Sequence, residues 1–306
     1  MTMGSIGMTP AKLTLGPVLF HWQPEAWRDF HYRIADEADI DTVCVGEVVC
    51  SKRMPFLTPL IPDVVARLTA AGKEVVLSSL ALIMSERELD DATALAANQA
   101  CLIEANDISL VALLAGRNFA VGPLVNVYSE ATLATLEALG ATRVCLPAEL
   151  PEARLAALAA GAKAGLEVQV FGRLPLAISA RCYAARTRNL AKDGCRFVCG
   201  EHPDGMTVET LDEVPFLATN GTQTLSCRYA NLLAELPRLS ALGIHRFRLS
   251  PQRVDMVAVA SVFRAALDNS IDAAEAEDRL RGLCPGAEFA NGYFHGQPGH
   301  AFVEAD

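Results

Sequence analysis

The chain has 306 residues, of which 51% are hydrophobic and 6% aromatic, and its net charge is −10. This composition is typical of a well-packed globular protein and excludes an intrinsically disordered chain. Nothing in the sequence resembles a basic stripe, so nucleic-acid binding through phosphate contacts is disfavoured. No run of eighteen or more apolar residues occurs, so we expect no transmembrane helix and no stable membrane insertion.

The N-terminus lacks the basic segment and apolar core of a secretion signal. We interpret residues 1–11 as a short disordered leader and expect a cytoplasmic protein. In that compartment the nine cysteines stay reduced. An odd number of cysteines also fits poorly with a disulfide framework.

Short apolar runs alternate with helical stretches through the first half of the chain. Trp27, Phe30 and Ile34 lie on one face of a predicted helix. The runs predicted as strands are 12–20, 41–47, 73–79, 107–114, 119–126, 142–147 and 166–172. The stretches predicted as helices are 24–37, 57–72, 85–105, 129–140 and 151–165, with Ser129 and Gly140 as caps of the fourth.

The second half of the chain is less regular. Residues 206–226 are mixed, and the pair Asn220-Gly221 predicts a hairpin or a strand pair there. We predict a helix over 228–243, an eighth strand over 245–251 and a helix over 254–268. The remainder is rich in Gly and Pro.

The eight predicted strands are mostly continuous apolar runs, which indicates burial on both faces and therefore a parallel sheet. Eight such units in about 260 residues favour an α/β fold of the (β/α)8 TIM-barrel type, regular or distorted. No dinucleotide-binding or phosphate-loop motif is present. We expect a barrel domain over 12–270 and a C-terminal extension over 271–306 that packs on it.

Three cysteines, Cys182, Cys195 and Cys199, follow the seventh predicted strand in a stretch with little apolar periodicity. We predict an inserted cysteine loop there, at the barrel face where such enzymes carry their chemistry. Clustered thiolates are typical of zinc, iron–sulfur or redox sites. Three thiolates leave a tetrahedral site one ligand short.

Cys50 is our candidate for the fourth ligand. It follows the second predicted strand, and its basic neighbours Lys52 and Arg53 favour a thiolate. A loop of more than twenty residues is long enough to cross the barrel mouth to reach it. The other cysteines are interpreted as core residues (Cys44, Cys101, Cys145), the start of a helix (Cys227) and part of the tail (Cys284). Spacing alone leaves zinc, an iron–sulfur cluster and ordinary reduced cysteines open.

Charged residues near these cysteines are candidates for substrate binding. Glu47 ends the second predicted strand and either orients a substrate or ligand or pairs with Arg53. Arg173 and Arg181 flank the cysteine loop and are suited to a carboxylate group. Lys52 and Arg53 belong to the same basic rim, which could bind a carboxylate or donate hydrogen bonds to sulfur, but we interpret these two as solvated surface charges. No catalytic residue is identified.

The stretch 167–182 resembles the signature of the collagenase-like peptidase family, E-x-F-x-H-G-A-x-C-x-[SY]-x-S-G-x-C. The matching positions are Glu167, Gly172, Ser179 and Cys182. The chain has Phe171, Pro175 and Ala180 where the signature has its His, its first Cys and its second Gly. Members of this family are barrel proteins, and several carry iron–sulfur clusters.

The chain is similar to a branch of this family at 16–22, 46–53, 182–199 and 291–299. The resemblance implies a 4Fe–4S cluster held by Cys50, Cys182, Cys195 and Cys199. It also implies a heterodimer with a paralogous subunit, which hydroxylates ubiquinone precursors without dioxygen. A lipid-binding accessory protein and a prephenate-like oxygen donor belong to the same expectation.

Two other hypotheses remain open. One is a thiol-dependent peptidase, the activity in the family's name. The other is a non-catalytic partner subunit with a four-cysteine zinc site. The peptidase hypothesis is weakened because the signature's His is absent at position 171, and because a thiolate bound to iron is not free to attack a substrate.

Overall fold

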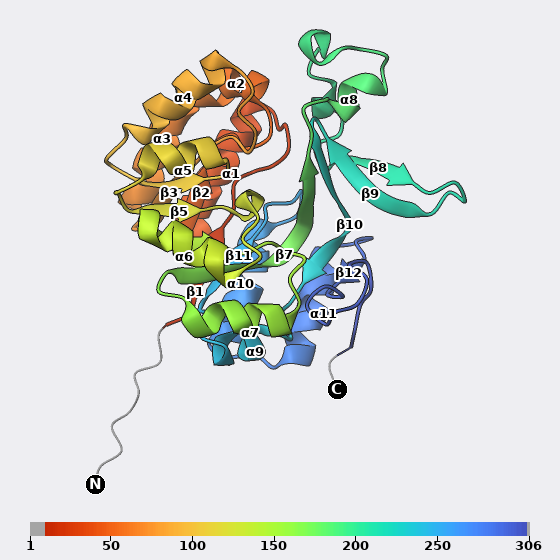
Figure 1. Ribbon diagram of the computed structural model, residues 1–306. Helices are drawn as coiled ribbons and strands as arrows, with labels where there is room; N and C mark the ends of the chain where they lie inside the picture. The colour runs from red at the N-terminus through yellow and green to blue at the C-terminus, as the bar shows by residue number, and fades with distance from the viewer. Residues whose placement is uncertain (1–9, 305–306) are drawn as a thin grey trace.

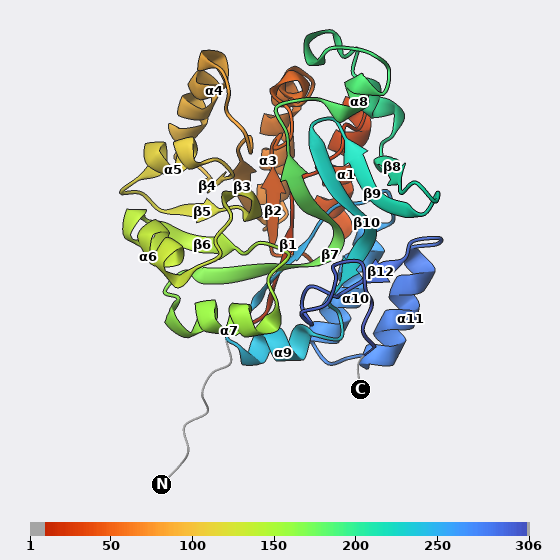
Figure 2. The ribbon, with the colours of Figure 1, turned by 45° about the vertical axis from the view of Figure 1, so that its right-hand side comes forward.

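The computed structural model describes residues 10–304. Eight parallel strands form a closed barrel (Figures 1 and 2). They are β1 (Lys12–Leu15), β2 (Thr42–Val45), β3 (Glu74–Ser78), β4 (Leu102–Ala105), β5 (Phe119–Val121), β6 (Ala141–Cys145), β7 (Gly165–Ile178) and β11 (Arg246–Leu249). β11 pairs with both β1 and β7 and so closes the ring. The predicted (β/α)8 barrel is confirmed.

Helices cover the outside of this barrel (Figure 1). They are α1 (Pro24–Glu37), α3 (Ile61–Ala70), α4 (Glu86–Ala96), α5 (Ile108–Leu114), α6 (Glu130–Leu139), α7 (Glu152–Gly161), α9 (Leu236–Ala241) and α10 (Met256–Leu267). The predicted caps of α6 are confirmed: the side chain of Ser129 accepts the N–H of Thr132, and Gly140 is left-handed. Trp27 and Ile34 of α1 are buried in the core, as their spacing predicts.

The predicted strand at 107–114 is wrong, and so is the end of the helix predicted over 85–105. Residues 108–114 form α5, while the strand of this unit is β4, immediately before it. The carboxylate of Asp107 accepts the N–H of Ser109 at 2.8 Å and starts the helix. A short apolar run fits a buried strand and a buried helix equally well, so periodicity could not separate them. Cys101 consequently lies in the turn before β4, half-buried, and not in a helix.

The helix predicted over 228–243 is also wrong in its first half. β10 (Gln223–Asn231) runs antiparallel to β7, and only α9 is helical. Cys227 therefore lies within a strand and not at the start of a helix. The predicted hairpin is confirmed, because β9 (Pro215–Asn220) turns into β10 at Gly221.

β7 extends far beyond the strand predicted at 166–172. Its first half belongs to the barrel, and its second half leaves the barrel and pairs with β10. With β9 and β8 (Met206–Glu209) these strands form an antiparallel extension (Figure 2). Gly172 lies between the two halves with φ +95°, where a Cβ would come within 2.7 Å of the carbonyl oxygen of Ser250. The extension carries the cysteine loop, residues 179–205.

The chain after residue 271 forms α11 (Ala273–Leu283) and the short strand β12 (Phe289–Ala290), which pairs with β10. Asn291 donates from Nδ2 to the carboxylate of Glu235 at 2.9 Å. Of the predicted leader, residues 1–9 lie outside the described residues. Among residues 10–304, no helix has the length and apolar character needed to cross a membrane.

Candidate functional site

The interior of the barrel is filled by a buried ion-pair network. Arg248 donates from Nε to Glu167 at 2.5 Å and pairs through Nη2 with Glu104. Thr14 donates to the second oxygen of Glu167 at 2.6 Å. Although burial opposes ionisation of Glu167, Arg248 and these hydrogen bonds hold its pKa below the usual value. The cavity above Arg248 has a volume of only about 20 Å³, enough for one water.

Cys182, Cys195 and Cys199 lie together in a small buried cluster within the cysteine loop. Short turns of helix position them: Cys182 precedes α8 (Tyr183–Arg186), Cys195 follows η4 (Lys192–Gly194) and Cys199 lies in η5 (Val198–Glu201). The cluster is completed by Ala184, Ala185, Leu190 and Val198. The structure therefore places the three loop cysteines in one small buried cluster on the loop that begins with α8 (Figure 1 shows α8).

The turn that carries Cys50 contacts the cysteine loop and the β9–β10 hairpin. Cys50 is half-buried and immediately precedes η1 (Ser51–Arg53). Lys52 donates from Nζ to the carbonyl oxygen of Asp193 at 2.9 Å. Thr222 donates to the carbonyl oxygen of Val49 at 2.9 Å. The turn that carries Cys50 and the loop that carries the other three cysteines are therefore in contact, although Cys50 itself packs against the main core.

Arg53 joins these segments from a buried position, with only 1% of its surface exposed. The prediction of a solvated surface charge is wrong for this residue. Its Nη2 donates to the side-chain oxygen of Asn220 at 2.7 Å, and its Nη1 donates to the carbonyl oxygen of Leu19 at 3.2 Å. A Cβ on Gly221 would lie 2.5 Å from Nη2, and φ there is +75°, so this position requires glycine.

The charge of Arg53 acts directly on the neighbouring thiols. Burial raises the pKa of Cys50 and of Cys199, and the guanidinium partly opposes this on both. The adjacent Cys182 and Cys195 raise the pKa of Cys199 further. Burial also works against the charge of Arg53, but Glu47, Cys199 and Cys50 hold its pKa above the usual value.

Glu47 lies under the Cys50 turn and is buried. Its Oε1 accepts the N–H groups of Val49 at 2.8 Å and Cys50 at 3.0 Å, and lies 3.8 Å from Nη1 of Arg53. Burial raises the pKa of this carboxyl group, while Arg53 and the two N–H groups act in the opposite direction. Glu47 therefore both pairs with Arg53 and fixes the backbone of Cys50.

The two arginines predicted to bind substrate have different surroundings. Arg173 is held by residues of the antiparallel extension and its loop. It donates to the carbonyl oxygens of Ser226 and Cys227 and forms an ion pair with Asp204 at 3.2 Å. Arg181 is exposed next to Cys182. Arg181 lines an open concavity of about 500 Å³ together with Arg186 and Lys192.

Two residues of this region were not predicted from the sequence. Asn220 was seen only as part of a turn, but its side chain donates to the carbonyl oxygens of Cys199 at 2.9 Å and His202 at 2.7 Å. His21 packs against the rings of Phe56 and Phe197. Burial, together with Arg53, lowers its pKa to about 4, so its ring is neutral at pH 7. The Asn-Gly pair was the only sequence signal for Asn220.

The fit of a metal group can be judged from the donors present. Within residues 10–304, no group of three or more His, Cys, Asp or Glu side chains is arranged as a ready metal site. In chemical type, however, four thiols on two contacting segments suit a sulfur-ligated group. In addition, Nε of Arg53 is a buried donor for which the described residues provide no acceptor. An anionic sulfur centre would satisfy this donor.

Comparison with known proteins gives two findings. A solved structure, phospho-2-dehydro-3-deoxyheptonate aldolase from Thermotoga maritima, is similar with 9% sequence identity and a TM-score of 0.43, over 94% of this chain and 75% of that one. The family model described as Peptidase family U32 matches residues 26–303, which include the whole barrel after β1 and the cysteine loop. The chain therefore belongs to peptidase family U32, the collagenase-like family that the signature over 167–182 predicted.

Proposed function

We propose that this chain is an iron–sulfur subunit of the UbiV type, with a 4Fe–4S cluster held by Cys50, Cys182, Cys195 and Cys199. One observation carries the proposal: three of these thiols share a buried cluster, and the turn of the fourth is bonded to the same loop. The resemblance at 46–53 and 182–199 supplies the type of cluster. The reduced thiols that it needs fit a cytoplasmic location.

The chain's own residues have defined parts in this proposal. Glu47 fixes the backbone of Cys50, and Asn220 fixes that of Cys199. Arg53 offsets the negative charge of the thiolates and offers its free Nε–H to sulfur, which tunes the potential of such a centre. With four thiolate ligands the cluster has no open iron position, so when bound it supplies electron transfer or stability.

The reaction we propose is the oxygen-independent hydroxylation of ubiquinone precursors. This chain would act in a heterodimer with a UbiU-like paralogue, assisted by the lipid-binding protein UbiT. The basic concavity formed by Arg181, Arg186 and Lys192 lies beside Cys182. Its charge suits a carboxylate-bearing oxygen donor of the prephenate kind.

Metal analysis of anaerobically purified protein tests the cluster. We expect about four irons and four acid-labile sulfides per chain, in keeping with a 4Fe–4S centre. Cys50→Ala should lose most of this iron. Cys101 is also half-buried but lies in the turn before β4, so Cys101→Ala is the control and should keep the iron. One zinc per chain and no sulfide would refute the cluster. Unchanged iron in Cys50→Ala would refute Cys50 as a ligand.

A genetic experiment tests the pathway separately. Deletion of the gene should abolish ubiquinone in cells grown without oxygen and leave aerobic ubiquinone unchanged. Complementation with the wild-type gene should restore it, and complementation with a Cys195→Ala variant should not. Normal anaerobic ubiquinone in the deletion strain would contradict the proposed reaction even if the cluster is present.

The peptidase hypothesis has the family description in its favour. A catalytic thiol, however, needs a lowered pKa and a neighbouring base. Burial raises the pKa of both Cys50 and Cys199, and Phe171 is fully buried where the signature has its His. The zinc hypothesis is decided by the metal analysis above.

A further inference from the structure

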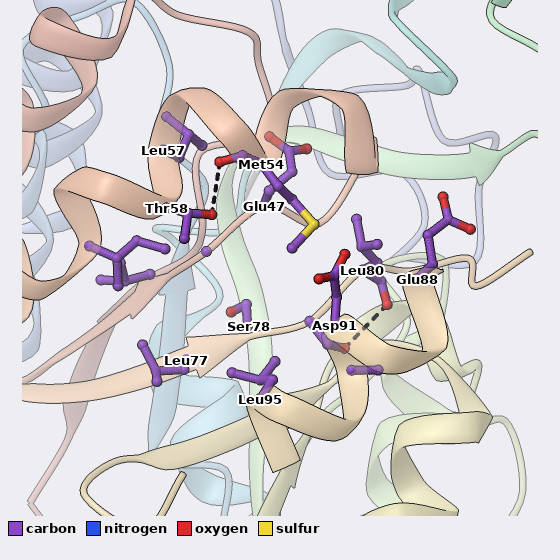
Figure 3. A pocket seen from close by; sticks show the side chains of 15 residues that line it. Glu47, Met54, Leu57, Thr58, Leu77, Ser78, Leu80, Glu88, Asp91 and Leu95 are labelled. Atoms are coloured by element: carbon purple, nitrogen blue, oxygen red, sulfur yellow. Dashed lines mark hydrogen bonds between the residues drawn. The ribbon is translucent and has the colours of Figure 1, made fainter. Parts of the chain in front are cut away.

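A second pocket lies outside the barrel wall, between α3 and α4 and under the short helix α2 (Met54–Leu57) (Figure 3). Cys44 of β2 faces Arg248 in the barrel interior, so its neighbour Val45 faces outward into this pocket. The aliphatic walls are formed by Val45, Leu57, Ile61, Leu77, Leu80 and Leu95. The volume is about 180 Å³. A dry apolar cavity of about 150 Å³ in another protein binds benzene, so this space suits one ring or a short aliphatic group.

One carboxylate points into this apolar space. Asp91 of α4 is half-buried and directed toward the middle of the pocket (Figure 3). Throughout the part of the chain that the structure describes, no hydrogen bond or ion pair engages this carboxylate. The pocket lining contains no Lys, Arg or His. Its oxygens are not among the buried atoms that lack a partner, so water reaches them, and a ligand that displaces this water must bring a donor of its own.

The other two carboxylates at the pocket already accept hydrogen bonds from other residues of the chain. Glu88 accepts hydrogen bonds from the hydroxyl of Ser51 at 2.5 Å and the N–H of Met84 at 2.8 Å. Glu47 holds the Cys50 turn, as described above. Arg53 offsets the charge of Glu47, whereas Glu88 and Asp91 give the pocket a negative charge, which repels anionic ligands and attracts cations. Asp91 is left as the group that a ligand can engage.

We propose that this pocket binds a small apolar molecule carrying a protonated amine. The apolar part lies among the aliphatic walls, and the ammonium group pairs with Asp91. Binding removes apolar surface from water and gives the half-buried carboxylate a charged donor. The lining contains no cysteine, although Glu47 belongs both to this pocket and to the Cys50 turn, and the proposal does not depend on the proposed cluster.

Calorimetric titration of the full chain with three probes of the same shape tests the proposal. Benzylamine carries the cation, benzyl alcohol a neutral donor and benzoate an anion. We expect benzylamine to bind about tenfold more tightly than benzyl alcohol, the ratio typical of a hydrogen bond to a charged group. Benzoate should not bind. Absence of benzylamine binding, or equal binding of benzoate, would overturn the proposal.

Variants locate the binding in this pocket. Ala92→Leu fills the space from its floor and should weaken benzylamine binding more than tenfold. Asp91→Asn should weaken benzylamine about tenfold and change benzyl alcohol less than about twofold. Asp90→Asn, exposed at the adjacent position and outside the lining, is the matched control and should change neither. Undiminished benzylamine binding in Asp91→Asn would place the amine elsewhere, and circular dichroism verifies that each variant is folded.

Discussion

Arg248 and Arg53 are both buried, but their surroundings differ sharply. Arg248 lies inside the barrel between the carboxylates of Glu104 and Glu167. Their two negative charges surround its one positive charge. Arg53 lies at the rim of the barrel mouth, where its close partners are carbonyl and amide oxygens. Its only carboxylate, among the residues described, is Glu47 at 3.8 Å.

The difference shows where the molecule can hold negative charge. Inside the barrel two carboxylates already surround one guanidinium, and the remaining cavity holds about one water. At the rim, the positive charge of Arg53 lies beside Cys50 and Cys199. The Nε–H of Arg53 is a donor that has no acceptor in residues 10–304. In this protein the interior of the barrel is therefore structural, and the candidate chemistry lies to one side of the mouth.

Replacing Arg248 should have the largest effect. Arg248→Met leaves two buried carboxylates without a counter-charge, so we expect a loss of about 4–5 kcal/mol in the free energy of unfolding. Urea denaturation followed by circular dichroism measures it. Arg87→Met, on the exposed face of α4, is the control and should stay within about 0.5 kcal/mol of wild type. A loss below about 1 kcal/mol for Arg248→Met would show that the network is not a stabilising unit.

Replacing Arg53 should have a smaller and more local effect. Arg53→Met removes three hydrogen bonds to oxygen and leaves Glu47 with backbone donors only, so we expect a loss of about 3 kcal/mol. Amide hydrogen exchange should accelerate around Cys199 and Asn220 while β1 to β6 stay protected. Arg53→Lys keeps the charge and should recover part of the loss. Uniform acceleration across the barrel would contradict the assigned role as a local tie.

His31 of α1 extends the comparison to a buried group kept uncharged. Its Nδ1 lies 2.7 Å from the carbonyl oxygen of Trp27, and its Nε2 is buried without a partner in the described chain. Burial lowers its pKa from 6.5 to about 4, so protonation favours the unfolded state. The stability this provides is complete above pH 6.5 and is lost as the pH falls toward 4, with about 2 kcal/mol lost at pH 5.

The variant His31→Leu should remove that part of the pH dependence. Unfolding free energies measured at several pH values between 7 and 4.5 should fall less steeply for the variant than for wild type. The carboxylates titrate equally in both proteins, so the difference between the two curves isolates His31. Parallel curves would mean that His31 is already protonated, or solvated, in the folded protein.

Much of the fold was predictable because local patterns and global architecture agree. Seven of the eight barrel strands coincide with predicted apolar runs, and the Asn220-Gly221 hairpin is where its turn chemistry placed it. The errors at 107–114 and 228–243 have different causes. The apolar run at 107–114 was compatible with a strand or a helix, and Asp107 begins a helix there. At 228–243, pairing of β10 with β7, which is distant in the sequence, decided the structure of the first half.

The candidate site was predictable only where residue chemistry is itself informative. Cysteines suggest ligands wherever they lie, and Cys50, Cys182, Cys195 and Cys199 remain a prediction to be tested. The burial of Arg53 was not accessible, because it depends on Leu19 and Asn220, which are distant in the sequence. The same holds for Asn220, whose bonds reach back to the cysteine loop.

The pairing of β11 with both β1 and β7 has a consequence for how the chain is made. During synthesis β1 keeps an unpaired edge until residues 246–249 emerge, near the end of translation. The guanidinium of Arg53 likewise lacks its Asn220 partner until residue 220 has been made. Cys50 is therefore made long before the three loop cysteines and before Asn220, and its surroundings are completed only late in synthesis.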